Sequence, residues 1–87
     1  MRGIAALCLA AVLLLSACAH MPVVVASKDT VQDRILGEMM ALTLEARGLP
    51  VERRIGLGDS ADLFQALRAG EVDVYPEYSG TALALLD

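Results

Sequence analysis

Strand-like and helix-like segments alternate along residues 23–87, and this alternation limits the possible folds more than any other feature of the sequence. The run Val23-Val24-Val25-Ala26 is rich in β-branched residues, contains no polar residue and is bounded by Pro22 and Ser27, which predicts a strand buried on both faces. Residues 51–55 and 72–75 predict two further strands, and a helix-like segment follows each of the three. This order predicts an α/β fold, a parallel sheet with flanking helices and right-handed crossovers.

Capping residues and glycines predict where the helices begin and end. The first helix is capped by Asp29 or Thr30, and the second by Asp59 or Ser60 after a turn that begins at Gly56. The last helix begins after Ser79-Gly80-Thr81, with Thr81 as a capping candidate. Gly48 ends the first helix, Gly70 ends the second, and Pro76 ends the third strand.

The first helix has a broad apolar stripe, which we expect to pack against the sheet. The stripe consists of Ile35, Leu36, Met39, Met40, Leu42, Leu44 and Ala46. The polar residues expected on the opposite face are Gln32, Asp33, Glu38 and Glu45. The methionines are expected to fill the core.

The first 17 residues have the features of a targeting segment. Arg2 precedes an uncharged apolar run over residues 4–15, which is shorter than the ~20 residues that a membrane-spanning helix needs. The run leads into Leu15-Ser16-Ala17-Cys18, which resembles a lipobox. We therefore predict a lipoprotein signal peptide over residues 1–17, a lipidated Cys18 and short linker over 18–22, and a solute-binding segment over 23–87. The alternative is ordinary secretion, in which Cys18 is removed with the signal peptide.

Charge and residue inventory exclude several functional classes. Of the seven basic residues Arg2 would leave with the signal peptide, so the mature chain would carry six against eleven acidic residues, which argues against nucleic acid as a partner. His20 is the only histidine, and loss of Cys8 with the leader would leave Cys18 alone, so neither a metal centre nor a nucleophilic site is expected. Glu77 is expected to face water, as loop carboxylates usually do. We predict no enzymatic activity and no cofactor.

Two loops at the carboxyl ends of the predicted strands carry the candidate ligand-binding residues, because a parallel sheet places its binding crevice there. Lys28 follows the first strand and precedes a helix N-terminus, where an anion is favoured, although a surface lysine is the plainer interpretation. Tyr75 and Tyr78 are two of the three aromatic residues, and tyrosine faces attract quaternary ammonium groups. Alternatively, Tyr75 packs in the core and Tyr78 lies on a loop.

Motifs along the whole of residues 23–87 resemble the start of osmoprotectant-binding proteins of the glycine betaine, carnitine and choline class. The most specific is the run Asp73-Val74-Tyr75-Pro76-Glu77-Tyr78-Ser79-Gly80-Thr81. The others are Ser27-Lys28, Ile35-Leu36-Gly37-Glu38-Met39, Gly56-Leu57-Gly58, Phe64-Gln65-Ala66-Leu67 and Gly80-Thr81-Ala82-Leu83. The usual Ser-Lys-Asn-Phe-Thr-Glu is replaced here by Ser27-Lys28-Asp29-Thr30-Val31-Gln32, which leaves the ligand preference open.

The resemblance implies a type II periplasmic-binding-protein-like fold, whose two lobes close on a quaternary ammonium solute for an ABC permease with a cytoplasmic ATPase. It implies that Tyr78 is part of an aromatic cage and that Lys28 and Thr81 contact a ligand carboxylate. With Cys18 lipidated, the expected location is the extracytoplasmic side of the cell envelope, anchored to the membrane. The resemblance does not imply a ligand role for Tyr75.

Two complete lobes need a chain several times longer than 87 residues, so the resemblance covers only the first part of lobe 1. We expect either a fragment of a longer binding protein or a truncated product. In the second case the alternative function is that of a surface lipoprotein with a structural or partner-binding role. Half a lobe with an open sheet edge is a poor independent fold, which argues against this alternative.

Overall fold

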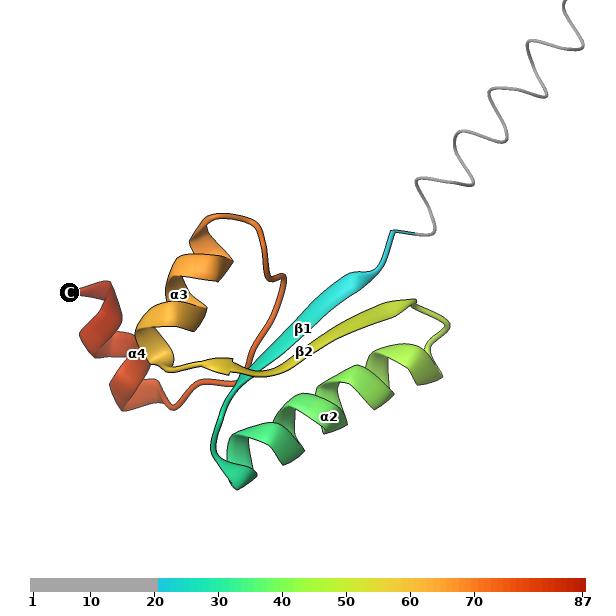
Figure 1. Cartoon of the computed structure of the whole chain (residues 1–87), viewed down its shortest axis with the longest axis horizontal. Helices are drawn as coiled ribbons and strands as arrows, with labels where there is room; N and C mark the ends of the chain where they lie inside the picture. The colour runs from blue at the N-terminus through green and yellow to red at the C-terminus, as the bar shows by residue number, and fades with distance from the viewer. Residues whose placement is uncertain (1–20) are drawn as a thin grey trace, which may run out of the picture.

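The computed structural model describes residues 21–87, which form a small α/β unit (Figure 1). The predicted signal peptide and Cys18 lie outside the described residues. The elements follow the order β1 (Val23–Lys28), α2 (Val31–Ala46), β2 (Val51–Gly58), α3 (Ser60–Arg68) and α4 (Ser79–Leu86). Within the described residues, no helix is both long enough and apolar enough to cross a membrane.

The sheet is parallel, as predicted, and β1 lies at its centre. β1 pairs with β2 from Val23 opposite Val51 to Ala26 opposite Arg54. On its other side β1 meets residues 72–74, where the predicted third strand is reduced to one parallel bridge between Val25 and Val74. The ladder is short because the Asp73 carboxylate, rather than a backbone carbonyl, accepts the amide of Val24 at 2.8 Å, and Pro76 has no amide to extend the pairing.

Helices cover both faces of this sheet, which explains why the apolar run of β1 does not alternate (Figure 1). One face packs against α3, where the buried cluster consists of Ala26, Leu63, Ala66 and Val72, with Val24 and Tyr75 against it. On the other face Gly37 of α2 lies so close to Ser27 that an added Cβ would be only 2.9 Å from the Ser27 Cβ. Because Tyr75 packs against the buried cluster beside α3, it contributes to the core of the unit.

The predicted packing face of α2 is wrong for most of its residues, since only Met40 and Leu44 of the predicted stripe are half-buried. The buried positions of this helix are Asp33, Gly37 and Ala41, one turn apart, because only small side chains fit where the helix axis comes close to the sheet. The exposed fractions of Ile35, Met39 and Leu42 are 54%, 57% and 59%. Asp33, expected in water, is 2% exposed.

The segment that begins at Gly56 is also different from the expected turn. Gly56, Leu57 and Gly58 form the last residues of β2, and the register changes so that Lys28 lies opposite Gly58. Gly56 has φ +75°, a left-handed conformation that suits glycine, and its amide donates to the Ser27 hydroxyl at 2.9 Å. This irregularity carries the end of β2 directly into the cap of α3.

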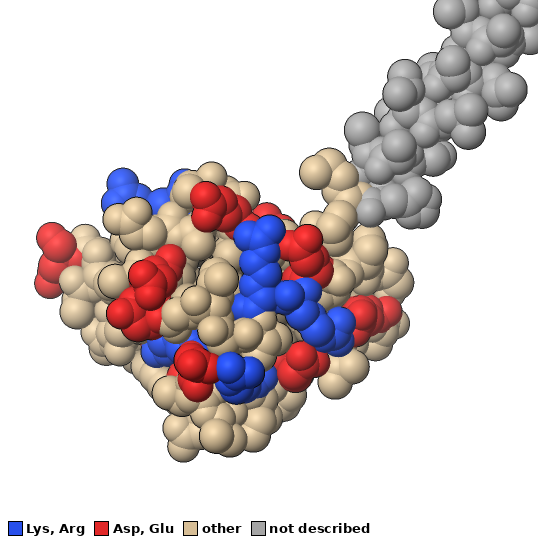
Figure 2. Space-filling model, in the orientation of Figure 1, with Lys and Arg blue, Asp and Glu red and all other residues tan. Residues whose placement is uncertain are grey.

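The predicted starts of α2 and α3 are confirmed within the alternatives considered. The side chain of Thr30 accepts the Asp33 amide at 3.1 Å, and Asp59 forms a reciprocal capping box with Asp62. For α4 the capping residue is Tyr78, without a side-chain hydrogen bond, so Thr81 is not the cap. Charges of both signs are interspersed on the face of the unit seen in Figure 2, with no broad basic surface there.

Candidate functional site

The carboxyl ends of β1 and β2 open onto a hollow of about 630 Å³, at the edge of the sheet where a ligand crevice was predicted. Its wall combines the end of β1, the caps of α2 and α3, and the start of α4. The lining residues are Lys28, Asp29, Thr30, Gln32, Asp33, Gly58, Asp59, Ser60 and Tyr78. Two of the three predicted ligand residues, Lys28 and Tyr78, therefore share one hollow.

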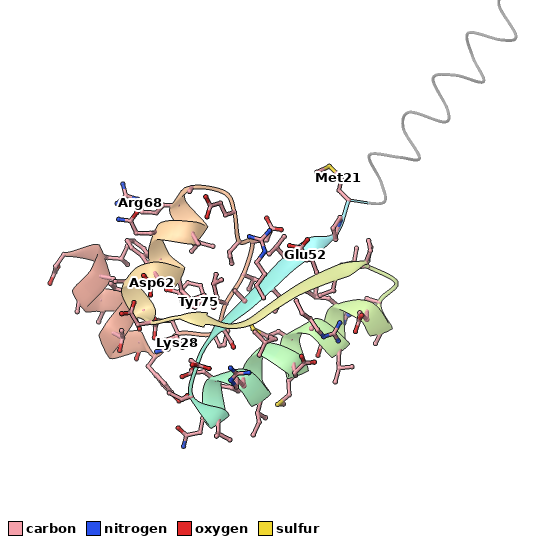
Figure 3. The ribbon with its side chains drawn as sticks, viewed as in Figure 1. Met21, Lys28, Glu52, Asp62, Arg68 and Tyr75 are labelled. Atoms are coloured by element: carbon pink, nitrogen blue, oxygen red, sulfur yellow. The ribbon has the colours of Figure 1, made fainter. Side chains whose placement is uncertain are left out.

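Lys28 is not the free surface lysine of the plainer interpretation. Its ammonium lies 2.6 Å from Oε1 of Glu77, and the side chains are 13% and 8% exposed. The Lys28 Nζ also lies 5.1 Å from the centroid of the Tyr78 ring, within cation–π range. Figure 3 labels Lys28 at the carboxyl end of β1.

Glu77 is the residue of this site that the sequence analysis placed wrongly. Its Oε1 accepts both the Lys28 ammonium and, at 3.0 Å, the amide of Tyr78, so one carboxylate oxygen joins the two predicted ligand residues. The expectation that it faces water is wrong, because its carboxylate bonds to the Lys28 ammonium at the end of β1 and its side chain is only 8% exposed. The sequence did contain one indication of this pair: a lysine follows the first predicted strand, and a glutamate follows the third, which neighbours it in the sheet.

The electrostatics of the pair are those of a partly buried ion pair. Burial raises the pKa of Glu77, but hydrogen bonds from the Lys28 ammonium and the Tyr78 amide lower it, and the net pKa is below the ordinary value. The hydrogen bond to Glu77 raises the pKa of Lys28, against the opposing effect of burial. Both groups are therefore charged at neutral pH.

Tyr78 presents an accessible ring to the hollow. It is 52% exposed, whereas burial raises the pKa of the neighbouring Tyr75, whose ring packs on the core (Figure 3). The two tyrosines thus have different environments, as one of the alternatives predicted. A single open ring beside the strand ends is suited to contact a cationic group.

Thr81 is less closely connected with this hollow. It lies in the first turn of α4, is partly buried and is not among the residues that line the hollow. Asp33 is a further lining residue that was not predicted. Its Oδ2 accepts the Thr30 hydroxyl at 2.5 Å, and its buried Oδ1 has no hydrogen-bond partner among residues 21–87.

A second, apolar hollow of about 530 Å³ lies beside α2, away from the strand ends. It is lined by Val23, Leu36, Met39, Met40, Thr43, Leu44, Asp73 and Val74. Those residues include part of the exposed apolar face of α2. It contains neither a tyrosine nor an ion pair, so the candidate ligand site is the hollow at the strand ends.

A hollow at the carboxyl ends of parallel strands is where open α/β sheets bind their ligands, so the fold and the site are those of a ligand-binding α/β unit. Residues 21–87 match the family described as the substrate binding domain of ABC-type glycine betaine transport systems. The chain belongs to this family. The members of this family are solute-binding components rather than enzymes.

Individual relatives agree with this assignment. The chain is 42% identical over 62 residues to the ergothioneine transport permease/ergothioneine binding protein EgtU of Helicobacter pylori, an alignment that covers 70% of this chain and 11% of the relative. It is 37% identical over 59 residues to the glycine betaine-binding protein YehZ of Escherichia coli, covering 68% of this chain and 19% of the relative.

A solved structure shows that the likeness extends to the fold. The structure of apo YehZ from Escherichia coli superposes with a TM-score of 0.71 and 34% sequence identity, over 75% of this chain and 23% of that chain. The predicted type II periplasmic-binding-protein-like fold is confirmed for this part of a lobe. The chain spans less than a quarter of the length of each of these relatives.

Proposed function

We propose that residues 23–87 are the first part of lobe 1 in the extracytoplasmic solute-binding component of an ABC importer, and that its solute is a quaternary ammonium osmoprotectant such as glycine betaine or choline. The observation that carries this proposal is the open ring of Tyr78 in the hollow at the strand ends, next to the Lys28–Glu77 pair. Family membership and the relative YehZ support it.

In this proposal the ring of Tyr78 contacts the trimethylammonium group, while Lys28 and Thr81 contact a carboxylate when the solute has one. One ring attracts a cation through its electron-rich face, but a cage needs several. The remaining rings would come from parts of the protein beyond residue 87. The lobes would close over the solute by a hinge motion and present it to the membrane permease and its cytoplasmic ATPase, with no covalent step.

A second candidate solute is ergothioneine, because the relative named for binding it is 42% identical to this chain over 62 residues. The same contact with Tyr78 would serve either solute if each presents a quaternary ammonium group. The two candidates are separated by direct titration.

We further propose that Cys18 carries a lipid that anchors the protein to a membrane on the extracytoplasmic side. The support is the sequence Leu15-Ser16-Ala17-Cys18 after an apolar run. A thioether-linked diacylglycerol together with an acylated amino terminus would supply the more than one acyl chain that stable anchoring needs. Metabolic labelling with a radioactive fatty acid should mark the wild-type protein and not a Cys18→Ser variant.

The binding proposal is tested by isothermal titration of the complete gene product with glycine betaine, choline and ergothioneine, alongside its Tyr78→Ala variant. Saturable binding of at least one solute, weakened about tenfold or more in the variant, is expected from loss of a cation–π contact in a desolvated site. Leu83→Ala, at a residue 67% exposed on α4, is the control and should bind as wild type. Absence of saturable binding would favour a structural or partner-binding lipoprotein instead.

A further inference from the structure

Asp33 has a buried carboxylate oxygen without a partner at the wall of the hollow. The residue is 2% exposed, and its Oδ2 accepts the Thr30 hydroxyl at 2.5 Å. Its Oδ1 is buried and has no hydrogen-bond partner among residues 21–87. Removing an acceptor from water without a new hydrogen bond costs free energy, and the cost is larger for a charged group. A donor that reaches Oδ1 would recover this cost.

The start of α2 holds Asp33 in this place. Thr30 caps the helix, and its hydroxyl accepts the Asp33 amide at 3.1 Å while it donates to the Asp33 carboxylate. Asp33 lies in the first turn, on the face of α2 that is buried against the sheet. The carboxylate is therefore fixed at the strand ends, where Asp33 and Tyr78 line the same hollow.

The other aspartates that line the hollow differ from Asp33 because their carboxylates have partners. Asp29 accepts the Arg34 guanidinium, and Asp59 accepts the amide of Asp62. None of the ion pairs within residues 21–87 includes Asp33. Asp33 also lies outside the motifs that this chain shares with its family, and it directly follows residues 29–32, where the usual family sequence is replaced.

We infer that Asp33 is a specificity-determining residue: its Oδ1 accepts a hydrogen bond from a hydroxyl or N–H group of the solute, so the site favours quaternary ammonium solutes that carry such a donor. A trimethylammonium group has no hydrogen to donate, so it remains at the Tyr78 ring. The inference rests on the proposed function, because it concerns the same ligand site. The preference depends on the donor and not on the net charge of the solute.

The first test uses the unmutated complete gene product. In propyltrimethylammonium a methyl group replaces the choline hydroxyl, so the two cations have the same charge and nearly the same size. Isothermal titration should show choline binding about tenfold more tightly or better, because only choline supplies a donor to the buried carboxylate. Equal affinities, or tighter binding of propyltrimethylammonium, would overturn the inference.

The second test is the Asp33→Asn variant, which keeps the shape of the side chain and removes its charge. The ratio of the dissociation constant for propyltrimethylammonium to that for choline should fall about threefold or more, because a charged acceptor makes the stronger hydrogen bond. Asp29→Asn removes the same charge at the same hollow, from a side chain 66% exposed, and should leave the ratio unchanged. An unchanged ratio in Asp33→Asn, or equal changes in both variants, would contradict a hydrogen bond to Asp33.

These outcomes separate the inference from the proposed function. If the wild-type protein binds no quaternary ammonium solute, the proposed function fails and the inference fails with it. If it binds glycine betaine, and Tyr78→Ala weakens that binding, the function stands. A failure of choline to bind more tightly than propyltrimethylammonium then overturns the inference alone.

Discussion

The ammonium of Lys28 lies 2.6 Å from the carboxylate of Glu77, although 49 positions separate the two residues in the chain. They meet because Lys28 ends β1 and Glu77 follows the segment that bridges β1 at Val74. Both side chains are at least 87% buried, so the pair contributes to stability as well as to the site. Its contribution should depend on pH.

We expect the Lys28–Glu77 pair to weaken in acid. The folded-state pKa of Glu77 lies below its ordinary value of 4.5, so its stabilising contribution is present above 4.5 and is lost as the pH falls through the folded value. Thermal unfolding followed by circular dichroism from about pH 6 to about pH 3 should show a smaller fall in melting temperature for Glu77→Gln than for wild type. Equal falls in both proteins would contradict this prediction; Glu71→Gln should follow wild type.

Gly37→Ala should destabilise the protein because α2 lies too close to the sheet for a Cβ. The added atom would meet Cδ1 of Ile55 at 2.8 Å and Cβ of Ser27 at 2.9 Å. We expect a loss of ~1–3 kcal/mol in the free energy of unfolding, measured by urea denaturation. Gly80→Ala, where no atom lies within 4 Å, is the control and should be neutral or stabilising. Similar losses in both variants would show that the close approach is not the cause.

Thr30→Ala should cost more than an ordinary helix cap. The Thr30 hydroxyl caps the Asp33 amide and also donates to the Asp33 carboxylate, which is 2% exposed. Loss of a cap costs ~0.5–2 kcal/mol, and the unpartnered buried carboxylate should bring the loss to the upper part of that range. Thr43→Ala removes an exposed hydroxyl that bonds only to the Met39 carbonyl and should cost less. Urea titration of both variants makes the comparison.

Tyr78→Phe should keep solute affinity within about threefold of wild type, since a cation is attracted by the ring face rather than by the hydroxyl. The hydroxyl makes no hydrogen bond within residues 21–87, whereas the ring is 5.1 Å from the Lys28 ammonium. Calorimetric titration with choline is the measurement. A loss as large as that of Tyr78→Ala would assign the binding contribution to the hydroxyl instead.

Local rules were sufficient for the parts of the fold that depend on neighbours in sequence. The uninterrupted apolar run from Val23 predicted a buried strand, and each of the caps Thr30 and Asp59 was one of two candidates predicted for its helix. These features are determined by hydrogen bonds within four residues and by strand composition. The parallel sheet then followed from the order of the elements.

Features that depend on contacts across the sheet could not be predicted in the same way. The packing face of α2 passes through Gly37 because the helix lies against Ser27 and Ile55. The spacing of apolar residues within the helix could not predict that contact. The third predicted strand is reduced to a single bridge because the Asp73 side chain, rather than a backbone carbonyl, accepts a hydrogen bond from β1. Glu77 was missed for the same reason, since its partner lies on another strand.

The outer edge of β2 has no strand beside it within residues 21–87. This open edge affects how a protein made of residues 21–87 alone would aggregate. Glu52, Arg53 and Arg54 place three consecutive charged side chains along that edge, and such charges oppose edge-to-edge pairing between molecules. Val31, Ile35, Met39 and Leu42 of α2 have no comparable protection. Aggregation of an isolated 21–87 piece should therefore begin at the helix, and polar substitutions on α2 should raise its solubility more than changes on β2.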